Sequence, residues 1–162
     1  MAWKEANICP VYKQKGPRSD PNNYRPISIL PILARCFEKL VAKDLQLLCD
    51  ARQVIPKEQY GFRKQSNCES ALISVVDQWS AAVDSGKLVG TLLLDISKAF
   101  DTIPHQRLLL ELQAIGCDQT ALCWFLSYLS DRKQRVVTRE GPSGWKAVSR
   151  GVPQGSCLSP LL

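Results

Sequence analysis

The stretch that decides the fold lies at residues 88–101 and reads Leu88-Val89-Gly90-Thr91-Leu92-Leu93-Leu94-Asp95-Ile96-Ser97-Lys98-Ala99-Phe100-Asp101. Its first part is a short apolar run of the kind typical of a strand buried on both faces. Asp95 follows that run directly, and a carboxylate fixed there favours a hard cation such as Mg²⁺, because an unpaired charge is costly to bury. A loop or cap role for Asp95 is equally compatible with the residues. For Asp101, capping of the next helix is favoured over metal ligation.

Two amphipathic helices are predicted before this strand. The first begins near Pro31, and its apolar face consists of Leu33, Phe37, Leu40, Val41 and Leu48. The second starts at the capping box Ser66-Asn67-Cys68-Glu69 and stops at Gly86. Its buried stripe consists of Leu72, Val75, Val76, Trp79 and Val83.

Two more helices and a hairpin are predicted after the strand. The helix that follows Pro104 buries Leu108, Leu109, Leu112 and Ile115. The next helix is capped by Asp118 and buries Leu122, Phe125, Leu126 and Leu129. Residues 134–138 and 145–148 alternate around a Gly-Pro-Ser-Gly turn, which indicates a hairpin. Residues 1–28 are predicted to form short extended pieces joined by turns. Helices with few strands indicate an α+β (mixed α/β) fold.

The composition is that of a soluble globular chain of about one domain, with 162 residues of which 45% are hydrophobic and 22% charged. No apolar run approaches the length of a membrane span, and no signal peptide is evident at the N-terminus. Seven cysteines without a CxxC pair, beside a single histidine, indicate free thiols rather than disulfides or a zinc site. These features predict a cytoplasmic or nuclear protein in a reducing compartment.

The net charge of +6 is unevenly distributed. Residues 1–66 carry a balance of +6, residues 67–129 of −4 and residues 130–162 of +4. Basic flanks suit a polyphosphate backbone and an acidic centre suits divalent cations, although solubility charge explains such a pattern equally well.

Several single residues leave alternatives open. His105 beside Pro104 is favoured as a helix-start residue over a catalytic base. Tyr12, Tyr24 and Trp3 lie near basic residues and suit either stacking on bases or packing within the protein. The glycines of 151–155 suit either a turn or a close approach to a ligand.

Five blocks occur along the chain in one order: Trp3-Lys4 through Val11-Tyr12-Lys13-Gln14-Lys15-Gly16, then Asn23-Tyr24-Arg25-Pro26-Ile27-Ser28, Gln59-Tyr60-Gly61-Phe62-Arg63-Lys64, Leu94-Asp95-Ile96-Ser97-Lys98-Ala99-Phe100-Asp101, and residues 151–162. In that order they resemble the reverse transcriptase domain of non-LTR retrotransposons. The resemblance implies a partial right-hand polymerase, with a fingers-like region at 1–86 and an incomplete palm at 87–162.

The resemblance implies specific roles for residues of these blocks. Asp95 is the catalytic aspartate, and together with the Ile96 carbonyl it faces the metal. Phe100 packs under the incoming sugar and excludes a 2′-hydroxyl group. Arg63 contacts the triphosphate of the incoming nucleotide, and Ile96, Gln154 and Gly155 line the nucleotide pocket. The residues implied to contact nucleic acid are Lys13, Lys15 and Arg25.

The implied partners are an RNA template, a DNA primer and deoxynucleoside triphosphates, without a membrane. The implied cofactor is Mg²⁺, with two ions in the complete enzyme and at most one here. The family's second aspartate block follows the Pro-Gln-Gly block, which corresponds here to residues 151–162, yet no Asp-Asp pair occurs in this chain. The sequence is therefore expected to be a fragment that lacks the remaining palm and thumb and does not polymerise alone. Two alternatives are a non-catalytic nucleic-acid-binding remnant and an unrelated α/β interaction domain.

Overall fold

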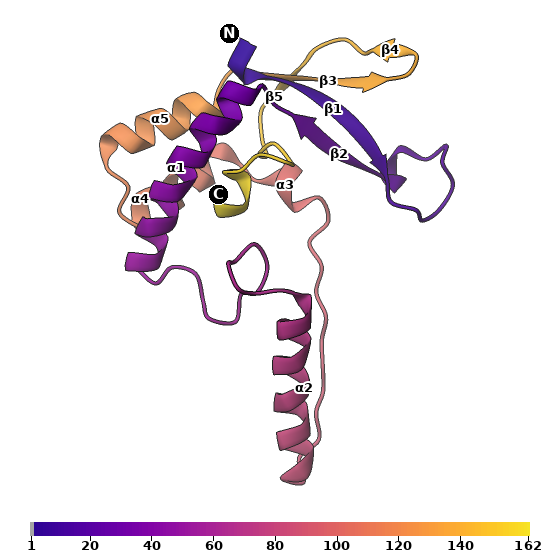
Figure 1. Ribbon diagram of the computed structural model, residues 1–162, viewed down its shortest axis with the longest axis vertical. Helices are drawn as coiled ribbons and strands as arrows, with labels where there is room; N and C mark the ends of the chain where they lie inside the picture. Colours follow the sequence, from indigo (N-terminus) through magenta and orange to yellow (C-terminus); the bar gives the residue numbers. More distant parts are fainter. Residues whose placement is uncertain (1) are drawn as a thin grey trace. The chain divides into compact units, whose positions relative to one another are not determined.

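The computed structural model describes residues 2–162 and divides the chain into two compact units (Figure 1). The first unit combines Met1–Arg52 with Lys98–Leu162, and the second is Gln53–Ser97. Within residues 2–162, no helix combines the length and the apolar character needed to cross a membrane. The prediction of an α+β fold is confirmed, because helices and a sheet occur together in this chain.

The first unit is built on a mixed sheet. Its strands are β1 (Glu5–Tyr12), β2 (Tyr24–Ile29), β3 (Arg132–Thr138), β4 (Gly141–Pro142) and β5 (Lys146–Val148). The order is β2-β1-β3-β4, and β5 also pairs with β3. β1 runs antiparallel to β2 and parallel to β3, with Ile8 opposite both Ser28 and Val136. The predicted extended pieces at the N-terminus and the predicted hairpin near the C-terminus are thus confirmed as parts of one sheet.

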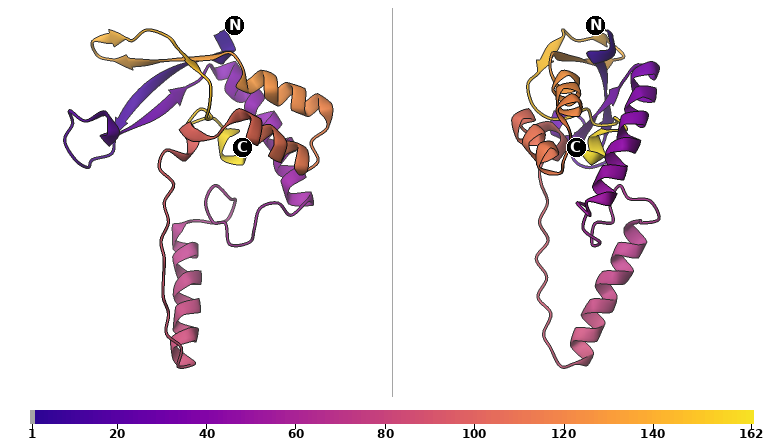
Figure 2. Two further views of the ribbon diagram at one scale, coloured as in Figure 1. Left: turned by 180° about the vertical axis from the view of Figure 1, so that it is seen from behind. Right: turned by 90° about the vertical axis from the view of Figure 1, so that its left-hand side faces the viewer.

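Helices and short turns complete the first unit. They are η1 (Ala2–Lys4), η2 (Pro21–Asn23), α1 (Ile32–Ala51), α3 (Ala99–Thr102), α4 (His105–Ala114), α5 (Gln119–Leu129) and η3 (Ser159–Leu161). The left view in Figure 2 shows α1, α4 and α5 gathered at one end of the sheet. The core lies there, and it includes the fully buried side chains of Leu129 and Leu158.

Helices α4 and α5 form as predicted. The Asp118 side chain accepts a hydrogen bond from the Ala121 N–H at 2.7 Å, so the predicted cap is confirmed. Leu108, Leu112, Phe125 and Leu129 are buried, whereas Leu126 is exposed. The predicted capping role of Asp101 is wrong: this residue lies within α3, and Pro104 precedes α4 without any side-chain hydrogen bond. Proline at that position has a backbone already extended for a helix entry.

Helix α1 forms where it is predicted but buries a different face. The buried residues are Ala34, Glu38, Leu45 and Cys49, while Leu33, Phe37 and Leu40 of the predicted stripe are exposed. The physical reason is that Glu38 carries hydrogen bonds to the core, which turns its side of the helix inward.

All seven cysteines are free thiols, as predicted. Burial raises the pKa of Cys49 and of Cys117; Asp50 raises it further at Cys49, and Cys49 and Asp118 raise it further at Cys117. Because the thiolate is the reactive form, a raised pKa lowers the reactivity of both thiols at neutral pH.

The second unit consists of a loop, helix α2 (Cys68–Asp84) and an extended segment. The capping box lies one residue later than predicted: the Asn67 side chain accepts the Ser70 N–H at 2.8 Å, and Ser70 Oγ accepts the Asn67 N–H at 3.0 Å. Gly86, with φ of +73°, ends the helix as predicted.

The prediction of a buried strand at residues 88–94 is wrong for this structure. In the part of the chain described, this segment has no strand pairing, and Leu88, Leu92, Leu93 and Leu94 are exposed. The predicted stripe of α2 also stays uncovered. A buried strand needs neighbouring strands to satisfy its backbone and a second layer to cover its side chains. Within 53–97 neither is supplied.

Candidate nucleotide-binding site

Residues 151–155 form a turn whose first half is held by the segment around α3. The Gly151 N–H donates to the Ile103 carbonyl at 2.8 Å, and the Val152 N–H donates to the Phe100 carbonyl at 2.7 Å. Gly151 has φ of +78°, and a Cβ added there would lie 2.6 Å from the Phe100 carbonyl oxygen. Only glycine fits this backbone conformation and this close approach.

The second half of the turn is held by strand β2. The Ser28 N–H donates to the Gln154 carbonyl at 2.7 Å. Gly155 has φ of +107°, and a Cβ there would lie 3.2 Å from the Ser28 carbonyl oxygen. The turn thus joins β2 to the segment that carries Phe100, so three distant parts of the sequence meet.

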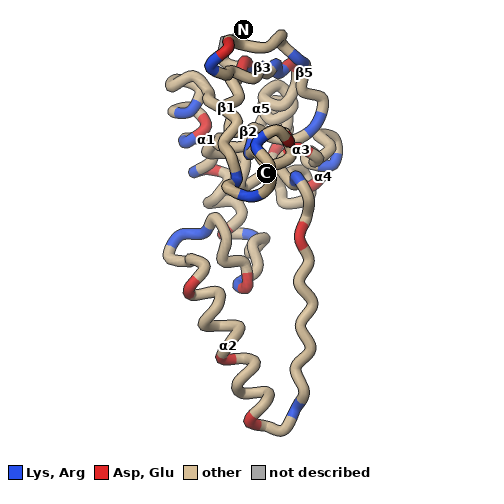
Figure 3. Tube along the Cα trace, turned by 90° about the vertical axis from the view of Figure 1, so that its right-hand side faces the viewer, with Lys and Arg blue, Asp and Glu red and all other residues tan. Residues whose placement is uncertain are grey.

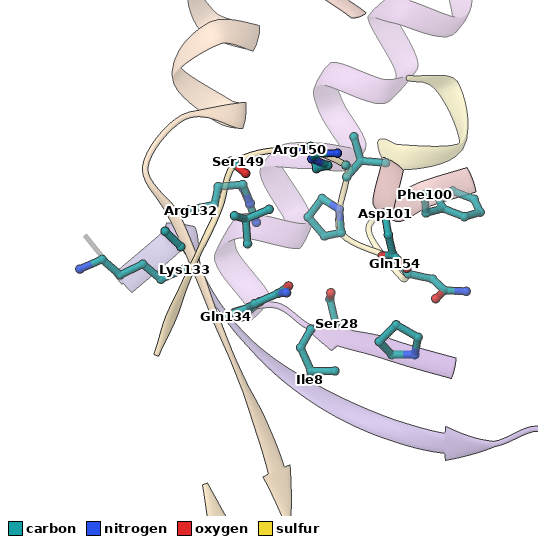
Figure 4. A pocket seen from close by; sticks show the side chains of 17 residues that line it. Ile8, Ser28, Phe100, Asp101, Arg132, Lys133, Gln134, Ser149, Arg150 and Gln154 are labelled. Carbon is teal, nitrogen blue, oxygen red and sulfur yellow. The ribbon is translucent and has the colours of Figure 1, made fainter. Parts of the chain in front are cut away.

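A cavity of about 310 Å³ lies between this turn and the sheet. Ile8, Ser28 and Gln134 line it from the sheet, while Phe100 and Gln154 line its edge beside α3 (Figure 4). Gln134 and Ser28 extend from the strands into the cavity in Figure 4. The remaining charged lining residues are Asp101, Arg132, Lys133 and Arg150.

This lining combines an aromatic ring, amide and hydroxyl groups and an excess of cations. Such a set can bind a polar, anionic molecule that also has a flat or apolar part. The structure therefore brings Phe100 and Gln154 together, and Gly155 lies in the same turn.

His105 supports the turn from the start of α4. Its Nε2 atom lies 2.8 Å from the Gly151 carbonyl oxygen. The imidazole ring is therefore within hydrogen-bond distance of the backbone of the turn. The predicted position of His105 at the start of a helix is confirmed.

Three predicted site residues belong to the second unit. Arg63 Nη1 donates to the Pro56 carbonyl at 3.1 Å, and Asp95 and Ile96 are exposed in the extended segment. Among residues 2–162, no group of three or more His, Cys, Asp or Glu side chains could hold a metal ion. Divalent ions bind to several oxygen ligands, so the described residues do not by themselves fit a two-ion centre.

The predicted nucleic-acid contacts lie on the β1–β2 hairpin, where Figure 3 shows basic positions. Lys13 Nζ donates to the Asn22 carbonyl at 2.9 Å, whereas Lys15 and Arg25 are exposed. Tyr12 and Tyr24 pack against each other, with ring centroids 5.5 Å apart. Of the two alternatives for these tyrosines, the geometry therefore favours packing.

A buried polar cluster that the sequence patterns do not predict lies beneath the turn. It consists of Glu38, Tyr128, Arg132 and Ser156, all of which are buried. The one available signal was Glu38 itself, an acidic residue one helical turn after the small Ala34.

Comparison with known proteins places the chain in a family. The model of the reverse transcriptase (RNA-dependent DNA polymerase) family matches residues 12–162. A sheet with helices at one end and a polar cavity beside a Pro-Gln-Gly turn is compatible with part of such an enzyme. The chain belongs to the reverse transcriptase family.

The similar proteins come from mobile elements of the predicted non-LTR type. The chain is 37% identical over 161 residues to a probable RNA-directed DNA polymerase from transposon X-element of Drosophila melanogaster. It is 35% identical to the RNA-directed DNA polymerase from mobile element jockey of the same species. It is 30% identical over 149 residues to a Pol polyprotein from the type-1 retrotransposable element R2 of Popillia japonica.

The chain spans only part of these relatives. The first two alignments cover 99% of the chain but 18% of each relative, and the R2 alignment covers 91% of the chain and 20% of that relative.

Proposed function

We propose that this chain is part of an RNA-directed DNA polymerase, in which the cavity beside the turn at 151–155 receives the incoming deoxynucleoside triphosphate. In the complete enzyme the 3′-hydroxyl of a DNA primer attacks the α-phosphate, and pyrophosphate leaves. Such phosphoryl transfer depends on positioning and on neutralisation of charge rather than on covalent chemistry.

One observation carries the proposal: Phe100 and Gln154, which lie 54 positions apart in the sequence, line the same cavity. The resemblance assigns both to the nucleotide pocket. In this role the Phe100 ring would lie under the sugar, where it leaves no room for a 2′-hydroxyl group. The basic lining residues Lys133 and Arg150 provide a favourable potential for phosphates.

The proposal also assigns roles to three residues of the second unit. Asp95 and Ile96 would contribute to binding of Mg²⁺, and Arg63 would contact the triphosphate. Because the chain contains no Asp-Asp pair, we propose that these 162 residues do not polymerise alone.

Nucleotide binding tests the proposed pocket. Equilibrium titration of the chain with dUTP and with UTP, which differ only in the 2′-hydroxyl group, is expected to show tighter binding of the deoxynucleotide. A ring that excludes one hydroxyl group discriminates by about tenfold to a hundredfold. Phe100→Val should remove most of this preference, whereas Phe37→Val, on the distant face of α1, should preserve it. An unchanged preference in Phe100→Val contradicts the role of the ring.

Primer extension tests the proposed inactivity. With Mg²⁺, an RNA template, a DNA primer and deoxynucleotides, the purified 162-residue chain is expected to incorporate no nucleotide. Incorporation that depends on Asp95 would show that the chain holds a complete polymerase site.

A second candidate function, a nucleic-acid-binding remnant, is favoured by the basic β1–β2 hairpin. Lys13, Lys15, Arg18 and Arg25 lie there with Asp20 as the acidic residue between them. Binding of single-stranded RNA should weaken steeply with salt, because each phosphate contact releases about 0.7 counterion equivalents. Fluorescence anisotropy between about 50 and 200 mM salt, a range over which several phosphate contacts give a large loss of affinity, measures this slope. Salt-independent binding would contradict it.

A further inference from the structure

Helix α1 contributes a buried acidic residue to the core of the first unit. Glu38 is 3% exposed, and each of its carboxylate oxygens accepts a hydrogen bond from a different part of the chain. The Tyr128 hydroxyl on α5 donates to Oε1 at 2.8 Å, and the Cys157 N–H donates to Oε2 at 3.2 Å. One side chain therefore connects α1, α5 and the segment that follows the turn.

Ser156 extends this connection into the backbone after the turn. Its Oγ accepts the N–H groups of Leu158 at 3.1 Å and Ser159 at 3.3 Å, and lies 3.2 Å from the Tyr128 hydroxyl. Since the single Tyr128 proton points to Glu38, the Ser156 hydroxyl donates to the Tyr128 oxygen. The Ser159 hydroxyl in turn donates to the Pro153 carbonyl at 2.9 Å, which closes the turn on itself.

The Tyr128 ring also lies against a buried cation. The buried Arg132 guanidinium lies 4.8 Å from the centroid of that ring, and its Nη1 donates to the Tyr128 carbonyl at 3.1 Å. Burial, and after it the negative charge of Glu38, raise the pKa of Tyr128. Tyr128 therefore remains a hydroxyl donor at neutral pH.

An apolar residue at position 38 would serve the core at a lower cost, because buried carboxylates are expensive unless they are fully hydrogen-bonded. What the carboxylate provides is two acceptors at fixed angles for two donors that are 29 positions apart in sequence. Removing an acceptor would leave the Cys157 N–H without its partner in a half-buried site.

We propose that Glu38 is a positioning residue for the nucleotide pocket: through Tyr128, Ser156 and the Cys157 N–H it holds the turn that presents Gln154. The role in nucleotide binding rests on the proposed function. The claim that Glu38 holds the turn rests on the hydrogen bonds alone. Glu38 acts from below the turn, since it is not among the residues that line the cavity.

Amide hydrogen exchange of the 162-residue chain tests the claim that Glu38 holds the turn. Glu38→Gln should speed exchange at Cys157, Leu158 and Ser159 by about tenfold, the effect of losing one well-satisfied buried hydrogen bond. Exchange at Ile8 and its β-sheet neighbours should not change. The matched control is Glu111→Gln, the same substitution at an exposed pair with Arg107 on α4.

Tyr128→Phe provides a second variant, because it keeps the ring and deletes only the hydroxyl group. It should speed exchange at the same three amides while the sheet remains protected. Unchanged exchange at these amides in both variants would overturn the claim that Glu38 holds the turn.

Titration with dTTP tests the role of Glu38 in nucleotide binding. In Glu38→Gln the dissociation constant for dTTP should rise by about threefold to tenfold, the range that corresponds to one hydrogen bond. Faster exchange with unaltered dTTP affinity would overturn the role of Glu38 in nucleotide binding. A wild-type chain that binds no dTTP would instead overturn the proposed function, and the exchange data would still decide whether Glu38 holds the turn.

Discussion

The two compact units of this chain use apolar residues in opposite ways. Every buried hydrophobic side chain identified in residues 2–162 belongs to the first unit, which combines 1–52 with 98–162. The second unit, 53–97, has an amphipathic helix and an apolar run, yet both remain uncovered. The difference teaches that an apolar pattern specifies a face to be covered, whereas a core forms only where a second surface covers it.

The largest expected difference between the units is in backbone protection. Amides of β1 paired with β3 should exchange at least about a thousandfold more slowly than unstructured amides, because they open only with the fold. Amides of residues 88–96 should exchange at nearly unprotected rates. Hydrogen exchange followed by mass spectrometry measures both in one sample. Strong protection at 88–96 would mean that this segment is paired in solution.

Truncation of a leucine side chain should change the free energy of unfolding much more in the first unit than in the second. Leu129 is 0% exposed and Leu93 is 89% exposed. Leu129→Ala should lower the free energy of unfolding by about 2–5 kcal/mol, from lost burial and the cavity that remains. Leu93→Ala should change it by less than about 0.5 kcal/mol. Urea denaturation gives both values, and equal effects would show that the second unit also has a core.

Glycine substitution should distinguish the turn from the extended segment. Gly151→Ala is expected to destabilise the chain by about 1–3 kcal/mol or more, because its positive φ and the nearby Phe100 carbonyl both oppose a side chain. Gly90 has nothing within 4 Å of an added Cβ. Gly90→Ala should therefore be close to neutral in the same denaturation experiment, and a neutral Gly151→Ala would contradict the described turn.

Helix caps should give the smallest effects. Asp118→Ala and Asn67→Ala each remove a side-chain cap, worth about 1 kcal/mol. Loss of the Asp118 cap should lower the thermal midpoint, because α5 carries the core residues Phe125 and Leu129. Loss of the Asn67 cap should reduce the helical circular dichroism signal without shifting that midpoint. A matching shift in both variants would indicate that the units unfold together.

Local signals predicted much of the first unit. The Asp118 cap, the leucines of α4 and the hairpin at 134–148 depend on residues close in sequence, and all three form. The Pro-Gln-Gly turn and Phe100 were found through the order of sequence blocks, and the structure places Phe100 and Gln154 in one cavity.

What could not be predicted depended on distant partners. The apolar stripe of α1 gave the wrong buried face, because the hydrogen bonds of Glu38 come from Tyr128 and Cys157, 90 and 119 positions away. The apolar run at 88–94 indicated a strand, but a strand is defined by neighbours that its own residues do not encode. The roles of Asp95, Ile96 and Arg63 remain predictions.

The central claim is that the cavity beside the turn at 151–155 receives a deoxynucleoside triphosphate. Its most direct test is an NMR titration of the isotope-labelled chain with dTTP, read as shifts of individual backbone amides. We expect the largest shifts at Phe100, Gly151 and Gln154. Shifts confined to the hairpin at 12–25, or no shifts at saturating nucleotide, would contradict the claim.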